Sequence, residues 1–149
     1  MIRLQQEDFD TGAEITALTK GRTDIGAVVS FSGLVRDHAG DTTIQGMELE
    51  HYPGMTEREL TRIETEANAR WPLQASLIIH RVGKLQPGEN IVLVVTASAH
   101  RSAAFEAAEF LMDFLKTRAP FWKREMSDKG THWVDAKPSD DDAAERWEK

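Results

Sequence analysis

Cysteine is absent from the 149 residues of this chain. Disulfide bonds and thiolate zinc sites are therefore excluded, and no side chain of this protein can carry a persulfide. If the protein handles sulfur, another molecule must bring it. His51 and His80 fall in strand-like segments without a third ligand at a recognisable spacing, which indicates structural histidines and predicts no metal site.

Long apolar runs are also missing. No segment approaches the roughly 18 apolar residues of a membrane helix, and the first residues, MIRLQQEDFD, do not resemble a signal peptide. We therefore expect a cytoplasmic protein that does not bind membranes. The formal net charge of -7 disfavours general binding to nucleic acids, but it allows a local basic pocket.

Residues 1–149 are expected to form a single domain, because 40% hydrophobic and 29% charged residues are typical of a globular chain. The acidic tail, about residues 138–149, contains Trp147. A tryptophan is costly to leave in water, so we expect this side chain to dock on the body of the protein or on a second chain.

Residue patterns predict an α+β fold with a mixed or antiparallel sheet. Runs of β-branched residues and alternating apolar residues predict strands at 25–31, 47–50, 75–82 and 90–98. The first of these strands should be mostly buried, and the last two should form a hairpin. Weaker patterns favour a helical turn at 13–18 and a short strand at 132–136.

Two longer helices follow from caps and periodicity. Thr56 and Glu59 match a capping box, which predicts a helix that ends before Pro72. Residues 102–117 are rich in Ala, Leu, Glu and Phe and predict a helix buried on several sides that ends before Pro120. Its phenylalanines are expected in the core: Phe105, Phe110 and Phe114.

Basic side chains gather at the boundaries of these elements. They are Arg36, the pair His100 and Arg101, and, around Pro120, Lys116, Arg118, Lys123 and Arg124. A helix N-terminus offers free N–H groups, so His100 and Arg101 suit a phosphate or a carboxylate. Solvated loop residues or surface ion pairs are the alternative, since sequence spacing does not show that these groups converge.

The segment 116–125 combines dense cations with two aromatic residues. We interpret it as a loop that forms one wall of a pocket for an anionic, planar ligand. Other roles stay open, because Lys116 would also stabilise the C-terminal end of its helix. Phe121 and Trp122 would alternatively fasten the loop to the core.

Five segments carry a resemblance to a known family. In chain order they read GAVVSFSGLVRDH, LEHYPGMTE, IIHRVGKLQPGE, SAHRSAAFEA and LKTRAPFWKRE. Together they resemble the large (catalytic) subunit of molybdopterin synthase, in the order found in that family and across residues 26–136. The last segment is the most distinctive.

The resemblance implies an α/β hammerhead type of α+β domain that forms a homodimer. It further implies a small ubiquitin-like subunit at each end of the dimer, giving a heterotetramer. That subunit carries sulfur as a thiocarboxylate on its C-terminal Gly-Gly tail. Two sulfur transfers convert a cyclic pyranopterin monophosphate to molybdopterin, so the chain would be a sulfurtransferase that needs no cofactor of its own.

Site residues are carried over from the same motifs. Lys116 and Lys123 match the two lysines that the family treats as catalytic. The substrate-binding residues implied by the resemblance also include Leu34, Val35, Arg36, His100, Arg101, Arg124 and Glu125, with Lys137 as a further candidate. Many relatives have lysine at the position of Leu34, so a side-chain contact is lost there. Part of the pocket is expected from the second chain.

Two other readings compete with the enzyme. A noncatalytic homologue would keep the dimer and the anion pocket as a scaffold or sensor, but retention of Lys116 and Lys123 argues against it. A small RNA-binding domain would stack bases on Phe121 and Trp122. The acidic composition and the single short basic segment argue against that reading.

Overall fold

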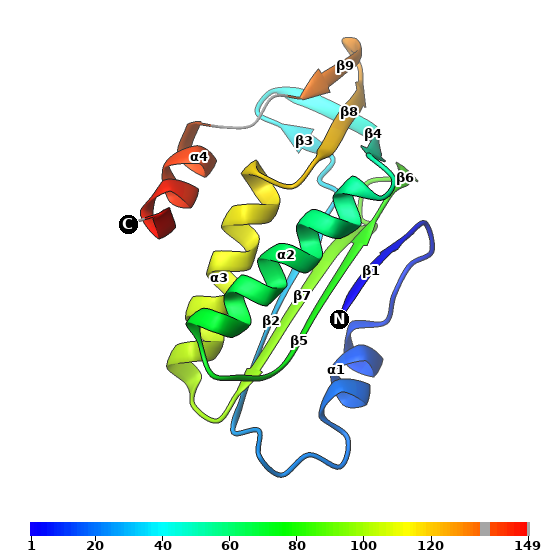
Figure 1. Ribbon diagram of the computed structural model, residues 1–149. Helices are drawn as coiled ribbons and strands as arrows, with labels where there is room; N and C mark the ends of the chain where they lie inside the picture. Colours follow the sequence, from blue (N-terminus) through cyan, green and yellow to red (C-terminus); the bar gives the residue numbers. More distant parts are fainter. Residues whose placement is uncertain (135–137, 149) are drawn as a thin grey trace.

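The computed structural model describes residues 1–134 and 138–148 and has the predicted α+β architecture (Figure 1). The elements in chain order are β1 (Ile2–Gln5), α1 (Thr11–Thr19), β2 (Ala27–Leu34), β3 (His38–Ala39), β4 (Thr42–His51), α2 (Met55–Arg70), β5 (Leu73–Arg81), β6 (Gly83–Leu85), β7 (Asn90–Ser98), α3 (Arg101–Thr117), β8 (Phe121–Ser127), β9 (Gly130–Val134), α4 (Pro138–Glu145) and the short 3-10 helix η1 (Arg146–Glu148). No helix in this described part is long and apolar enough to span a membrane.

The larger sheet is mixed and has the strand order β1-β5-β7-β2. β1 pairs with β5 in parallel, whereas β5, β7 and β2 pair antiparallel, as the predicted hairpin requires. α2 and α3 cover one face of this sheet, and α1 packs against the other (Figure 1). Apolar side chains on both faces explain why the central strands β5 and β7 are buried along most of their length.

A second, antiparallel sheet lies beyond one end of the first (Figure 1). Its order is β3-β4-β8-β9, and β6 also pairs with β4. Val35, Met47, Leu49 and Leu85 form a small buried cluster on this side of the molecule. Met47 and Leu49 alternate with the less buried Glu48 and Glu50, which confirms the predicted half-buried strand.

Several details of the sequence analysis were wrong. α2 begins at Met55 rather than after Thr56, and Glu57, not Glu59, accepts the backbone N–H that precedes the helix, that of Gly54. Phe105 is 61% exposed, because it lies on the side of α3 away from the sheet. Thr56 is instead buried in the first turn of α2.

Two strands also differ from expectation. β2 is an edge strand, and its Val28 and Phe31 are exposed rather than mostly buried, since none of the described elements covers that edge. The segment interpreted as a pocket loop forms β8, where it gains backbone hydrogen bonds from β4 and β9. The strand predicted at 132–136 is β9; residues 135 and 136 lie outside the described residues.

The acidic tail contains α4 and packs along α3 (Figure 1). Trp147 meets Trp71 and Phe110 edge to face, with ring centroids 5.6 and 5.5 Å apart. Its indole N–H donates to Asp113 at 2.7 Å. The prediction that Trp147 docks is therefore confirmed, and the surface on which it docks is this chain's own helical layer.

Candidate active site

α3 fixes the positions of two groups of predicted site residues. His100 is the residue before the helix and Arg101 is its first residue, whereas Lys116 lies in its last turn. Fifteen residues of α-helix between Arg101 and Lys116 span about 22 Å, at roughly 1.5 Å per residue. The two groups therefore occupy opposite ends of the helix.

Lys123 belongs to the same end as Lys116. A short connection leads from α3 into β8, in which Lys123 lies opposite Leu49 of β4. Phe121 and Lys123 point to the same face of β8, because alternate residues of a strand share a face. The exposed side chain of Lys116 lies close enough to His80, which stacks on Phe121, to influence its protonation.

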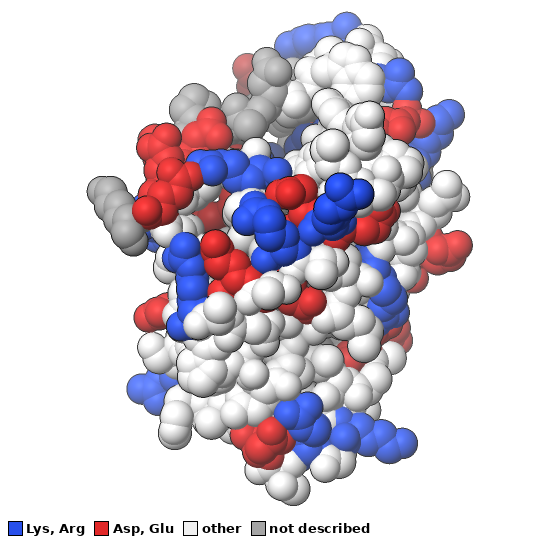
Figure 2. Space-filling view, viewed as in Figure 1, with Lys and Arg blue, Asp and Glu red and all other residues white. Residues whose placement is uncertain are grey.

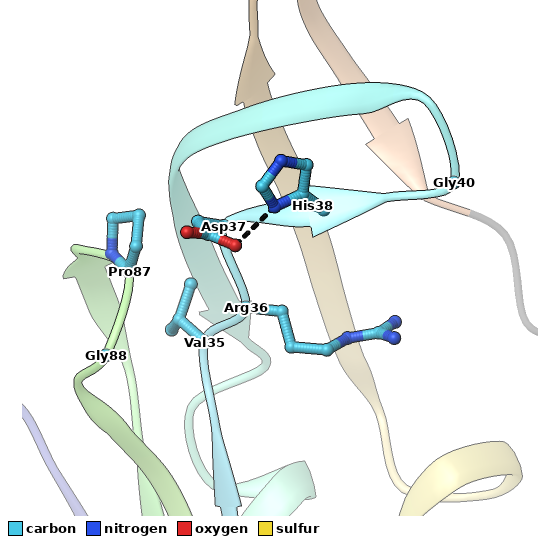
Figure 3. A pocket seen from close by; sticks show the side chains of 7 residues that line it. All are labelled: Val35, Arg36, Asp37, His38, Gly40, Pro87 and Gly88. Atoms are coloured by element: carbon cyan, nitrogen blue, oxygen red, sulfur yellow. Dashed lines mark hydrogen bonds and ion pairs between the residues drawn. The ribbon is translucent and has the colours of Figure 1, made fainter.

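Arg36 follows β2, at the end of the large sheet where the second sheet begins. It borders a cavity of about 530 Å³ lined also by Val35, Asp37, His38, Gly40, Pro87 and Gly88. Figure 3 shows the Arg36 side chain directed away from Asp37 and His38, which pair with each other. The guanidinium thus stays outside this local ion pair and is available to an anion.

Leu34 and Val35 have different surroundings from Arg36. Val35 is buried in the small cluster of the second sheet, and its backbone accepts from Gly88 and donates to Glu89. Leu34 is 50% exposed at the end of β2. A ligand would therefore meet Leu34 at the surface, whereas the Val35 side chain acts in packing.

Arg124 and Glu125 are held by neighbours within the second sheet. Arg124 forms an ion pair with Glu48, directly opposite it on β4, and its guanidinium lies 5.3 Å from the ring centre of Trp133. The Glu125 carboxylate is 3.8 Å from the His132 imidazole. These contacts brace the strand that carries Lys123.

His100 and Arg101 are exposed where β7 leads into α3. Within residues 1–134 and 138–148, neither side chain forms a hydrogen bond or ion pair with the protein. Exposed cations at the N-terminal end of a helix, where backbone N–H groups are also free, form an anion-binding arrangement. The predicted placement of both residues between a strand end and a helix start is confirmed, and their binding of an anion stays a prediction.

The predicted residues do not all meet within one chain. Arg36, Lys116 and Lys123 lie toward the second sheet, whereas His100 and Arg101 lie at the far end of the large sheet. The pairing of β2 with β7 shows the same separation. Ser98, shortly before His100, pairs with Ala27 at the start of β2, whereas Arg36 follows the other end of β2, where Leu34 pairs with Asn90. Lys137 lies outside the described residues.

His80 is a buried ionisable group close enough to the lysine end of α3 to be influenced by Lys116. The pKa of its imidazole is lowered from 6.5 to about 4, mainly by burial, with smaller contributions from the positive charge of Lys116 and from the nearby His51. A backbone hydrogen bond to Arg81 opposes these effects without outweighing them. The imidazole is therefore neutral at physiological pH.

Thr56 is a contributor that sequence reasoning missed. Its hydroxyl donates to the carbonyl oxygen of Pro120 at 2.9 Å and accepts from the backbone N–H of Tyr52, also at 2.9 Å. The capping-box pattern had assigned this hydroxyl to the helix start. Nothing in the local sequence signals a contact that spans 64 residues.

Metal binding and broad polyanion binding find no support in the described side chains. In those parts of the chain, no group of three His, Asp or Glu residues is arranged to hold a metal ion. Acidic and basic side chains are interleaved over α2 and α3, so this face has no broad basic surface for nucleic acid (Figure 2). The arrangement instead suits a small anion.

Comparison with known proteins identifies the family. The model of the MoaE protein family matches residues 4–118. The chain belongs to the MoaE family. A molybdopterin synthase catalytic subunit from Mesorhizobium japonicum is 63% identical over 148 residues, covering 98% of this chain and 92% of that protein. One from Pseudomonas aeruginosa is 56% identical, covering 99% and 98%.

Solved structures of MoaE proteins share the fold. The molybdopterin biosynthesis MoaE protein from Burkholderia ambifaria has a TM-score of 0.85 at 50% identity, covering 100% of this chain and 98% of that one. Molybdopterin synthase from Staphylococcus aureus has a TM-score of 0.82 at 32% identity, covering 89% and 96%. The α+β fold expected from the resemblance is thus confirmed for this MoaE chain.

Proposed function

We propose that this chain is the catalytic subunit of molybdopterin synthase. It converts a cyclic pyranopterin monophosphate to molybdopterin with two sulfur atoms from the C-terminal thiocarboxylate of a small ubiquitin-like subunit. The observation that carries the proposal is the placement of Lys116 and Lys123 on either side of the α3–β8 connection. A cysteine-free chain must receive its sulfur from outside, which agrees with this chemistry.

Each lysine has a distinct task in this proposal. Lys116 lies beside the thiocarboxylate terminus, where a cation assists attack by sulfur and release of the acyl group. Lys123 stabilises the charge that develops on the pterin and its phosphate. Arg36 supplies a further fixed charge at the same end of the molecule, free of the Asp37–His38 pair.

His100 and Arg101 act from the second chain of a homodimer. They lie on the order of 22 Å from Lys116 in their own chain, which is too far to contact the same small substrate. The free edge of β2, with exposed Val28 and Phe31, offers a surface for a second copy. A twofold axis near the middle of β2 would place the partner's His100 and Arg101 beside Arg36.

In this shared site the partner's His100 and Arg101 bind the phosphate. His100 donates a proton as the phosphate ester opens. Leu34 contacts the substrate through its backbone and Val35 adjoins this contact, while Arg124 and Glu125 support the strand beneath it. Lys137 is retained as a further candidate.

The remaining expectations form part of the same proposal. Residues 1–149 act as one domain in the cytoplasm, two copies pair, and each site receives one small subunit, which gives a heterotetramer. The chain requires no cofactor, because the partner supplies the sulfur. The contact between the acidic tail and α3 supports treatment of the tail as part of the domain.

The test combines purified protein, the cyclic pterin phosphate and the thiocarboxylated small subunit, and measures molybdopterin. We expect product from the wild type and at least about a hundredfold loss for Lys116→Ala and for Lys123→Ala, since each removes a charge that stabilises the transition state. Lys20→Ala, which removes an exposed lysine after α1, is the control and should keep full activity. A wild type that binds the small subunit yet makes no product would identify a noncatalytic scaffold instead.

A further inference from the structure

The connection between α3 and β8 is short and tightly held. Lys116 and Lys123 are seven residues apart in the sequence, with Pro120 between them. The backbone turns through hydrogen bonds from Arg118 and Ala119 to the carbonyl oxygen of Phe114. The buried hydroxyl of Thr56 then holds the carbonyl of Pro120 at 2.9 Å.

His80 holds the next residue along this connection. Its ring stacks on Phe121 with centroids 3.9 Å apart and an angle of 16° between the planes. Phe121 is the first residue of β8, two residues before Lys123 and on the same face of the strand. The position of the imidazole therefore sets where this strand begins.

The imidazole is itself fixed in one orientation. Its Nδ1–H donates to the carbonyl oxygen of Arg81 at 2.8 Å, since a carbonyl can only accept. Arg81 is also immobilised, because its buried guanidinium donates to the carbonyl of Gln6 at 2.8 and 3.0 Å and to that of Asn90 at 3.0 Å. His80 thus connects a rigid part of the large sheet to the first residue of β8.

We propose that His80 is a positioning residue for sulfur transfer, which holds Phe121 in place and thereby sets the spacing between Lys116 and Lys123. This inference rests on the proposed function for its catalytic consequence, but the spacing itself is a property of the protein alone. The reaction requires both ammonium groups at one small substrate, and a misplacement of about 1 Å can cost about a hundredfold in rate. His80 itself contacts no substrate.

The groups that face His80 explain why a neutral imidazole is needed. Lys116 approaches from α3 and His51 from β4, and Glu57 of α2 lies 3.7 Å from His51. A positive charge on the His80 imidazole would repel the nearby Lys116 ammonium.

The absence of cysteine permits a direct test of spacing. Lys116→Cys and Lys123→Cys, introduced together and spin-labelled, report the distance between the two positions by electron paramagnetic resonance. Labelled chains are diluted with unlabelled chains so that signals between copies are suppressed. We expect one narrow distance distribution in the parent, a broad one with His80→Ala and a narrow one with His80→Phe, which retains a flat ring against Phe121.

Ile79→Ala is the matched control, because Ile79 is the fully buried neighbour of His80 on β5 and packs on the opposite face of the sheet. It should lower stability while leaving the distribution narrow. An unchanged distribution in His80→Ala, or equal broadening in His80→Ala and Ile79→Ala, would overturn the inference. So would equal broadening in His80→Ala and His80→Phe.

Turnover by chains that retain both lysines provides the catalytic readout. With His80→Ala we expect kcat to fall at least about tenfold, with KM for the pterin phosphate within about twofold, whereas His80→Phe and Ile79→Ala stay within about threefold of wild type. If His80→Ala broadens the distribution but keeps kcat, the inference is overturned. If the wild type makes no product while His80→Ala still broadens the distribution, the proposed function fails and the positioning role stands.

Discussion

The two ends of α3 carry the same sign of charge in very different surroundings. At the C-terminal end, Lys116 is next to a connection that Thr56 and His80 hold in place, and a second sheet lies beyond it. At the N-terminal end, His100 and Arg101 extend into solvent without a side-chain partner among the described residues. The C-terminal end is thus held by contacts within the chain, whereas the side chains at the N-terminal end have no such contacts among the described residues.

The comparison shows which cations are already paired with carboxylates and which are available to bind a ligand. Arg124 and Arg146 lie beside carboxylates, so their charge is already compensated. Arg101 is left without such compensation, and it lies on the end of the helix where the dipole favours an anion. In a site shared between two copies, a bound phosphate would offset the repulsion between the cations that the two chains bring together.

The strongest test of the comparison mixes two inactive variants. Lys116→Ala and Arg101→Ala should each lose at least about a hundredfold in activity as separate homodimers. In a mixed dimer, one of the two sites has both an intact Lys116 and an intact Arg101. Random mixing of equal amounts makes about half of the dimers mixed, so about one quarter of all sites should be restored. The measurement is molybdopterin formation after the subunits have exchanged.

The control for this experiment mixes Lys116→Ala with Lys123→Ala. Both changes affect the same end of α3, so no mixed dimer contains an intact site and activity should stay low. Equal recovery in both mixtures would show that the two ends do not combine across chains.

Acidification should lower the stability of the folded protein through protonation of His80, close to the C-terminal end of α3. The pKa of His80 is about 4 in the folded protein and about 6.5 when unfolded, so the unfolded chain takes up this proton first. Stability is therefore lost as the pH falls from about 6.5 to about 4, by roughly 3 kcal/mol from this group. Urea unfolding at several pH values measures the loss.

His80→Phe provides the reference for the acid experiment, because phenylalanine does not titrate. Carboxylates such as Asp8, whose pKa is lowered by hydrogen bonds from Asn90 and its own neighbour Phe9, contribute equally in both proteins. The variant should lose less stability over this range. Parallel curves for the two proteins would mean that His80 is not held neutral by the fold.

The smallest effect is expected at Leu34, which is exposed at the end of β2. Leu34→Lys introduces the residue that the family resemblance implies at this position. Stability should change by no more than about 0.5 kcal/mol, and activity by no more than about twofold, because the side chain is not packed. Chemical unfolding and the product assay check this, and a large gain in activity would place a side-chain contact at residue 34.

Much of the helical layer could be predicted from the sequence, whereas strand β8 of the second sheet could not. Helix signals are local, so the spacing in α2 and α3 predicted both helices to within one or two residues. β8 depends on pairing with a distant strand, and its charged residues hide the apolar pattern. The acidic Glu48 opposite the basic Arg124 was the available signal, because opposite charges stabilise cross-strand pairs.

The sequence predicted where the candidate site residues lie along the helices and strands more closely than it predicted which of them lie together. The motifs identified Lys116, Lys123 and the cations at both ends of α3, yet residue identity alone does not show which groups meet. The length of the predicted helix already separated His100 from Lys116. The contacts of Thr56 and His80 with the α3–β8 connection could not be predicted, because they join segments far apart in the chain.

The length of α3 also has a genetic consequence. If the two ends of the helix serve different sites of the dimer, Lys116→Ala and Arg101→Ala on separate alleles complement each other. On one allele, the same two substitutions disable both sites of every dimer that this chain forms with a wild-type copy. The double-mutant allele would then be dominant negative, whereas either single mutant leaves each mixed dimer one working site.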